Sequence, residues 1–399
     1  MNNLKDELRP YVDAEIPQAM KRLAEDPLFV PAARYVFPSL SAELAREKLL
    51  EISTVKDFQM TWMYSFNKRV IDSTIDVFSS SCDVEPEPGK GYLYFSNHRD
   101  IILDSSLLQM ILVEKGLPTS AITYGNNLVV NQFAADIARS NKMYKVVRDT
   151  NRKELLLHSR LLSEFLHGSV SKGQSCWIAQ RSGRTKDGRD TTNPALVKML
   201  SLNTRVSTVA SLVDSYEALH LLPVSVSYQY ESCDFLKAQE QYHKTQTANY
   251  MKSTNEDMAS MLCGITQWKG NVHIHLGTPV AKDTLWRLVR EVGRSQGSVP
   301  DAVEPDAPVN SAFFNTFCQL LSEELDAQIH RNFKLFPYNY VAHDLRSGSR
   351  RYGDFYTPVQ KEVFSKRMDA GTPLSGKLSA PAKACFLDIY ANPVDSCGL

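Results

Sequence analysis

The sequence of 399 residues lacks net charge and paired cysteines. Lysine plus arginine and aspartate plus glutamate number 45 each, so no overall positive field indicates a protein that binds nucleic acid. Seven cysteines occur without a CxxC pair or other short paired spacing. This pattern argues against a disulfide framework and favours a reduced compartment. We therefore expect a cytoplasmic protein without a nucleic-acid partner.

Long apolar runs are also missing. No run approaches the ~20 residues that cross a bilayer, and the N-terminus lacks the apolar core of a secretory signal. We expect any membrane contact to be peripheral, on the inner face. The aromatic segment 29–40 and the basic segment 344–354 are candidates for it. Core packing explains the first segment equally well, and a solvated loop explains the second.

The length indicates several substructures, because single hydrophobic cores rarely grow beyond ~250–300 residues. Apolar residues at three- and four-residue spacings predict a helical N-terminal region over 1–88, including one long helix over 56–81. A segment rich in Pro, Gly, Ser and Asp predicts a linker or long loop over 286–309. It separates a central region, 89–285, from a helical C-terminal region, 310–399.

The central region alternates short β-rich runs with helical ones. This rhythm predicts an α/β domain with a mostly parallel, twisted sheet flanked by helices. The predicted strands are 92–96, 121–125, 144–147, 176–180, 222–230 and 271–277. The predicted helices are 104–116, 130–141, 151–173, 194–202 and 254–268, with a further amphipathic helix over 311–333.

The stretch "SNHRDIILD", residues 96–104, follows the first predicted strand and carries one base and two acids. Asp100 stands before an apolar run, where a carboxylate commonly caps the N-terminus of a helix. Asp104 falls on the apolar stripe of that helix, so its carboxylate needs a partner. His98 is the nearest candidate, and a paired imidazole of this kind is typical of a general base.

This stretch resembles the first motif of the glycerophospholipid acyltransferases, the glycerol-3-phosphate and 1-acylglycerol-3-phosphate acyltransferase superfamily. That motif is Asn-His, four residues, then Asp, whereas five residues separate His98 from Asp104, so Asp100 remains the alternative partner. Three later stretches resemble the second, third and fourth motifs in order: "KMYKVVRD" (142–149), "CWIAQRSGRTKDGR" (176–189) and "LLPVSVSYQY" (221–230). The resemblance covers roughly 90–280.

The resemblance implies transfer of a fatty acyl group from acyl-CoA or acyl-carrier protein, as co-substrate, to a hydroxyl of glycerol 3-phosphate or a lysophospholipid. His98 would be the base, supported by Asp104 or Asp100, with no metal and no other cofactor. Arg184 offers a planar fork to phosphate. The implied substrate-binding residues are Asn97, Arg99, Arg148, Gly183, Arg184, Thr185, Lys186 and Pro223.

Three alternatives stay open. The third motif normally carries glutamate where this chain has Arg181 or Ser182, which leaves a catalytically impaired or non-catalytic lipid- or acyl-binding relative as the second hypothesis. A serine hydrolase is disfavoured, because the GxSxG motif is absent. His273 and His275 share a strand face and could ligate a metal, although without a third ligand nearby a structural role is favoured.

Overall fold

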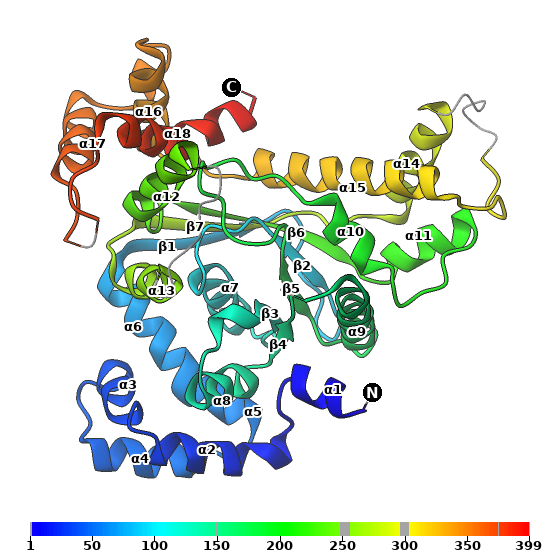
Figure 1. Ribbon diagram of the computed structural model, residues 1–399, viewed down its shortest axis with the longest axis horizontal. Helices are drawn as coiled ribbons and strands as arrows, with labels where there is room; N and C mark the ends of the chain where they lie inside the picture. The colour runs from blue at the N-terminus through cyan, green and yellow to red at the C-terminus, as the bar shows by residue number, and fades with distance from the viewer. Residues whose placement is uncertain (1, 149, 248–255, 296–302, 374, 399) are drawn as a thin grey trace.

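A seven-stranded sheet forms the centre of the computed structural model, which describes residues 2–148, 150–247, 256–295, 303–373 and 375–398 (Figure 1). The strand order is β1-β7-β6-β2-β5-β3-β4, and neighbours run parallel except β6 with β7. The prediction of a mostly parallel sheet flanked by helices is confirmed. The strands are β1 (Ile75–Cys82), β2 (Leu93–Ser96), β3 (Ala121–Gly125), β4 (Met143–Val146), β5 (Cys176–Ala179), β6 (Leu221–Tyr228) and β7 (Gly270–Leu276).

The first strand corrects one sequence prediction. Six predicted strands are present, but residues 75–81 were expected to continue a long helix and instead belong to β1, which pairs with β7. The preceding helix ends at Thr74. Ile75, Val77 and Phe78 are β-branched or aromatic, and such residues favour strands. The N-terminal region is therefore helical only up to Thr74.

The N-terminal helices enclose a core of their own at one end of the molecule (Figure 1). The segment 29–40 contributes to this core, where Phe29 and Val36 are buried, which supports the core-packing explanation of its aromatic residues. The elements are α1 (Asn2–Leu8), η1 (Asp13–Glu15), α2 (Ile16–Glu25), α3 (Phe29–Val36), α4 (Ala42–Leu50), α5 (Val55–Phe58), the π-helical turn η2 (Gln59–Met63) and α6 (Tyr64–Thr74).

Helices cover the two faces of the sheet with separate apolar cores. One face packs against α6 and α7 and includes Tyr94 of β2, while the other packs against α9, α10, α11, α14 and α15 and includes Leu93 and Phe95. Successive side chains of a strand point to opposite faces, which explains this division. The bounds are α7 (Leu103–Glu114), η3 (Asn126–Leu128), α8 (Gln132–Ser140), α9 (Arg152–Val170), α10 (Pro194–Leu200), α11 (Val209–Glu217), α12 (Asp234–Gln246), α13 (Glu256–Thr266), α14 (Lys282–Ser295) and α15 (Ser311–Arg331).

The linker prediction over 286–309 is wrong in its first part. Residues 286–295 belong to α14, whose Leu288, Val289 and Val292 are buried against the sheet. Residues 296–302 lie outside the described part of the chain, and residues 303–309 are an irregular connection to α15. The helical C-terminal prediction is confirmed by α15, α16 (Pro337–Ser347), η4 (Gly353–Phe355), α17 (Pro358–Ala370) and α18 (Ala380–Ser396).

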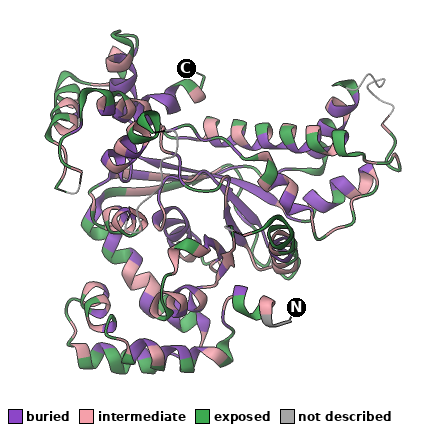
Figure 2. Ribbon diagram, in the orientation of Figure 1, coloured by how far each residue is buried: buried purple, intermediate pink, exposed green. Residues whose placement is uncertain are grey.

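The surface of the molecule consists mainly of helices, and most of the sheet is buried (Figure 2). Among the described residues, no helix combines the length and apolar character needed to cross a bilayer. The basic segment 344–354 closes the end of α16, because the buried Asp344 accepts hydrogen bonds from the Tyr352 backbone and the Tyr356 hydroxyl. These contacts give part of that segment a structural role.

A buried carboxylate joins the N-terminal helices to α8. Asp136 is 1% exposed and accepts hydrogen bonds from the Tyr11 hydroxyl at 2.7 Å and the Arg22 guanidinium at 2.6 Å. Asp136→Ala should lower the free energy of unfolding by about 1–3 kcal/mol, because it leaves a buried hydroxyl and a half-buried cation without their acceptor. Urea titration followed by fluorescence measures the change. The control Asp72→Ala removes an exposed ion pair with Lys68 and should leave the titration unchanged; equal effects would contradict the prediction.

Candidate active site

The candidate site lies at the ends of two neighbouring strands, where the chain leaves the sheet toward opposite faces. From β2 the chain enters α7 on one face of the sheet, and from the adjacent parallel β5 it enters α10 on the other face. In open α/β sheets, loops that separate in this way leave a crevice at the carboxyl ends of the strands, where ligands bind. His98 follows β2 and residues 181–189 follow β5, so both segments lie at this position.

The carboxylate of Asp104 is the centre of the hydrogen bonds at the crevice. Its Oδ2 atom lies 2.9 Å from His98 Nδ1 and accepts the backbone N–H groups of Arg99 at 2.7 Å and Asp100 at 2.9 Å. Its Oδ1 atom accepts the Tyr228 hydroxyl at 2.9 Å. The structure thus brings Asp104 and His98 together, and the catalytic role of the pair stays a prediction. Since an ionised carboxylate only accepts, Nδ1 of the ring carries the proton and the neutral imidazole keeps its lone pair on Nε2.

Asp100 has the predicted role of a cap at the N-terminus of a helix. Its Oδ1 atom accepts the backbone N–H groups of Ile102 and Leu103, both at 2.8 Å, at the start of α7, and its Oδ2 atom accepts the Ser232 hydroxyl. The expected cap is therefore present, and the acid next to the histidine ring is Asp104. Although burial acts in the opposite direction, these hydrogen bonds and the charge of Lys269 lower the pKa of Asp100.

Two aromatic side chains that sequence reasoning missed complete the surroundings of His98. The ring of Trp177, in β5, lies edge-on to the imidazole with 6.0 Å between centroids, and its buried Nε1–H has no hydrogen-bond partner among the described residues. Burial and the charge of Asp104 raise the pKa of Tyr228, at the end of β6, well above its ordinary value, so it stays a donor. Strand alternation could have found both, since both belong to the core on the face where α7 packs.

The loop after β5 contacts the histidine backbone directly. The Thr185 N–H donates to the His98 carbonyl at 2.8 Å. Arg184, beside it, is 5% exposed, and its buried Nη1 has no hydrogen-bond partner in the described part of the chain. Burial acts in the opposite direction, but the nearby Cys233 and Asp100 raise the pKa of Arg184. The loop therefore holds a buried cation with an unpartnered nitrogen, next in sequence to the residue whose backbone contacts His98.

The other residues predicted to bind substrate differ in how close they lie to the crevice at His98. Lys186 forms an ion pair with Glu240 of α12, and Gly183 adopts φ +74°, a backbone conformation that favours glycine. Pro223 is buried within β6, below the crevice. Arg148 is exposed beyond the end of β4, and β5 and β3 lie between β4 and β2. The structure thus brings the backbone of Thr185 to His98 and leaves Arg148 beyond β4, the last strand of the sheet.

Asn97 and Arg99, predicted to bind substrate, lie in a buried polar network. Arg99 contacts Asp190 at 2.6 Å and Glu231 at 3.0 Å, and Lys237 contacts the same Glu231 at 2.6 Å. Asn97 donates to Asp190 at 3.0 Å and bonds to the backbone of β6 through both ends of its amide. Two buried cations thus face two buried anions, and these contacts support the loop that holds His98. A substrate contact by either side chain stays a prediction.

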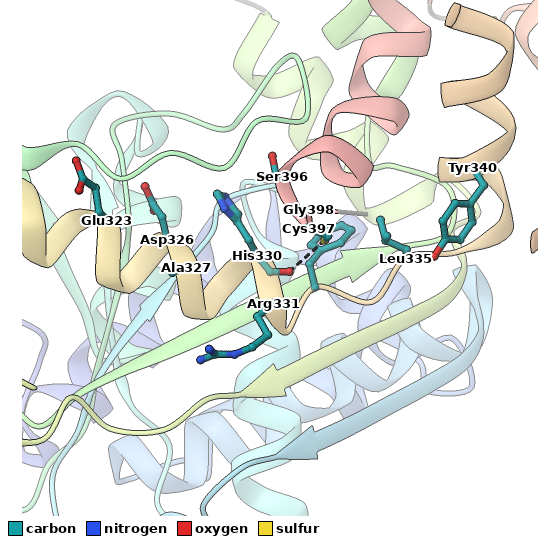
Figure 3. A pocket seen from close by; sticks show the side chains of 11 residues that line it. Glu323, Asp326, Ala327, His330, Arg331, Leu335, Tyr340, Ser396, Cys397 and Gly398 are labelled. Carbon is teal, nitrogen blue, oxygen red and sulfur yellow. Dashed lines mark hydrogen bonds between the residues drawn. The ribbon is translucent and has the colours of Figure 1, made fainter. Parts of the chain in front are cut away.

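A cavity of about 760 Å³ lies on the opposite face of the sheet, between α15 and the end of α18 (Figure 3). Its wall includes His330, which contacts the Asp190 carbonyl at 2.5 Å, and Phe333, whose ring lies 4.6 Å from the Arg99 guanidinium. The pair of Arg99 and Asp190 therefore separates this cavity from His98. We do not assign the candidate site to it.

The two strand histidines form part of a hydrogen-bonded row between β1 and β7. His273 lies 2.9 Å from Ser79 and 2.8 Å from Ser81, and His275 lies 2.8 Å from Ser81 and 3.0 Å from Asp83. Within the described ranges, no cluster of three or more His, Cys, Asp or Glu side chains could hold a metal ion. The structural explanation of these histidines is therefore supported.

Comparison of the sequence with models of protein families gives no match, and a search among curated proteins also gives none. The properties of the site consequently rest on its own geometry and on the resemblance of its motifs.

The two aspartates can be distinguished through the histidine ring. Asp104→Asn should change the tautomer of His98, because an amide can donate to Nδ1 while the wild-type carboxylate only accepts. Two-bond ¹H–¹⁵N NMR of labelled protein should show protonation at Nδ1 in the wild type and a shift of the proton toward Nε2 in the variant. The matched variant Asp100→Asn should leave these signals unchanged. The reverse result would assign Asp100 as the histidine's partner.

Proposed function

We propose that the protein transfers a fatty acyl group from acyl-CoA or acyl-carrier protein to a hydroxyl of glycerol 3-phosphate or a lysophospholipid. The observation that carries the proposal is the pairing of His98 with the buried Asp104 at the crevice, where the loop that carries Arg184 contacts His98 through the Thr185 backbone. The order of the four motif-like stretches along the chain also supports a relationship with the glycerophospholipid acyltransferases. The adjacent parallel strands β2 and β5 place the first and third of these stretches side by side at the carboxyl ends of the strands.

The chemistry follows from the ring orientation. His98 Nε2 takes the proton of the acceptor hydroxyl, and the oxygen attacks the thioester carbonyl to form a C–O bond. The resulting oxyanion collapses, the C–S bond breaks, and the thiolate takes the proton from the imidazolium. Asp104 stabilises the charged ring, and the buried indole N–H of Trp177 is a donor available to the oxyanion.

The acceptor is recognised through its negative charge. A buried guanidinium with an unused N–H is costly unless an anion occupies the position, and a phosphate accepts from such a planar group in two directions. Arg184 is joined to His98 through the Thr185 N–H, so a phosphate held there would keep the hydroxyl of a glycerol backbone close to the imidazole. Lys186 contributes less, because Glu240 balances its charge.

A second candidate is a catalytically impaired or non-catalytic lipid- or acyl-binding relative. The observation that favours it is the residue at the motif glutamate, here Arg181 or Ser182. A carboxylate does reach this loop from another element, since Glu240 of α12 contacts Lys186. The two candidates differ in turnover, which a single assay measures.

Purified protein should transfer radiolabelled acyl groups from acyl-CoA or acyl-carrier protein to glycerol 3-phosphate or lysophosphatidate, but not to an amino-lipid. His98→Ala should lower kcat/KM by about 10²–10⁴, because it removes the general base. Arg184→Ala should mainly raise KM for the phosphorylated acceptor.

The control His275→Ala removes a partly buried histidine outside the crevice and should keep wild-type activity. Full activity in His98→Ala would overturn the mechanism. Binding of acyl-CoA without turnover by the wild type would favour the second candidate.

A further inference from the structure

Two cysteines lie close together where the residue before α12 contacts α13, behind the candidate site. Cys233 precedes α12, and its sulfur lies 3.2 Å from the Ser260 carbonyl of α13, one helical turn before Cys263. The Gln267 Oε1 atom accepts both the Cys233 backbone N–H at 2.8 Å and the Cys263 thiol at 3.2 Å. The Gln267 side chain thus links the backbone of Cys233 to the thiol of Cys263.

The charges around the pair favour a thiolate. The hydrogen bond from Cys263 lowers the pKa of the Cys233 thiol, and the charges of Arg184 and Lys237 act in the same direction, against burial and Asp100. The same hydrogen bond and burial raise the pKa of Cys263. The positive charges of Arg184 and Lys237 therefore favour a thiolate at this pair of sulfurs.

The backbone conformation of Cys233 is also unusual. Cys233 has φ +57°, a left-handed conformation that non-glycine residues seldom adopt. Such conformations persist where the surrounding structure holds them and are concentrated at functional positions. Cys263 is partly exposed, which gives a small oxidant access to the pair.

We propose that Cys233 and Cys263 form a redox-active pair that hydrogen peroxide converts to a disulfide. The Cys233 thiolate attacks one peroxide oxygen, so an S–O bond forms, the O–O bond breaks, and hydroxide leaves as water after taking a proton. Cys263 then attacks the sulfenic sulfur, an S–S bond forms, and the S–O bond breaks with release of a second water. Two thiols and one peroxide thus give one disulfide and two waters.

The disulfide would act on the candidate site through two contacts. Arg184 would lose the negatively charged sulfur beside it. Gly264, which follows Cys263, lies against the Asp100 carboxylate so closely that a β-carbon would be 2.4 Å from its Oδ2 atom. A bond that ties α12 to α13 therefore fixes the helix that packs on the cap of α7.

Peptide mass spectrometry of the full chain tests the proposal without depending on acyl transfer. Reduced protein treated with stoichiometric hydrogen peroxide should give a linked Cys233–Cys263 peptide under non-reducing conditions, with the seven free thiols falling to five. The reaction should be roughly tenfold faster than oxidation of the partly buried Cys385, whose pKa is raised.

Two variants complete the experiment. Cys263→Ser should abolish the linked peptide and leave a sulfenic acid at Cys233 that dimedone traps, whereas the matched control Cys385→Ser should form the disulfide like the wild type. A wild-type protein in which Cys385 is oxidised as fast as Cys233, or in which no linked peptide forms, would overturn the proposal. Because turnover is not measured, these results are independent of the proposed acyltransferase activity.

Discussion

The buried carboxylate of Asp104 is the group on which the arrangement of the site depends. It is 1% exposed and accepts four hydrogen bonds, from the His98 ring, the Tyr228 hydroxyl and the backbone of Arg99 and Asp100. A buried ion is tolerated only when its acceptor capacity is filled, so these donors hold the end of β2, the start of α7 and the end of β6 in one geometry. The orientation of the imidazole is a consequence of that requirement.

Sequence patterns that extend over a few residues predict the local features of this site. The apolar stripe of "DIILDSSLL" is enough to separate a capping acid from a buried one, because Asp100 and Asp104 differ in their positions relative to the helix start. The short β-rich runs likewise predict six of the strands. The failure at β1 is of another kind: apolar spacing over 56–81 fits a helix, whereas the pairing that holds 75–82 as a strand is with β7, almost two hundred residues later.

The support beneath the site could not be predicted in this way. Arg99 contacts Asp190 and Glu231, at sequence separations of 91 and 132, and nothing in the neighbourhood of any of these residues indicates the others. Taken singly, each looks like a solvated surface charge, since Arg, Asp and Glu are seldom buried without partners. Tertiary packing alone makes them a balanced set of buried charges. Tyr228 is a further example. Its sequence context predicts an ordinary strand residue, and its hydroxyl gains a partner only because the helix that carries Asp104 packs beside it.

One buried donor near the crevice has no hydrogen-bond partner among the described residues. Arg99 and Lys237 are matched by two carboxylates, and Lys186 is matched by Glu240, but the Nη1 of Arg184 keeps an unused donor in the described structure. Leaving a buried N–H without an acceptor costs about 1–3 kcal/mol, a large share of the 5–15 kcal/mol that stabilises a typical domain. The neighbouring charges are all paired. A ligand that accepts this N–H removes the cost of the unpaired donor when it binds. An anionic ligand would do so, and this is the role that the proposed acyl transfer gives to the phosphate of the acceptor.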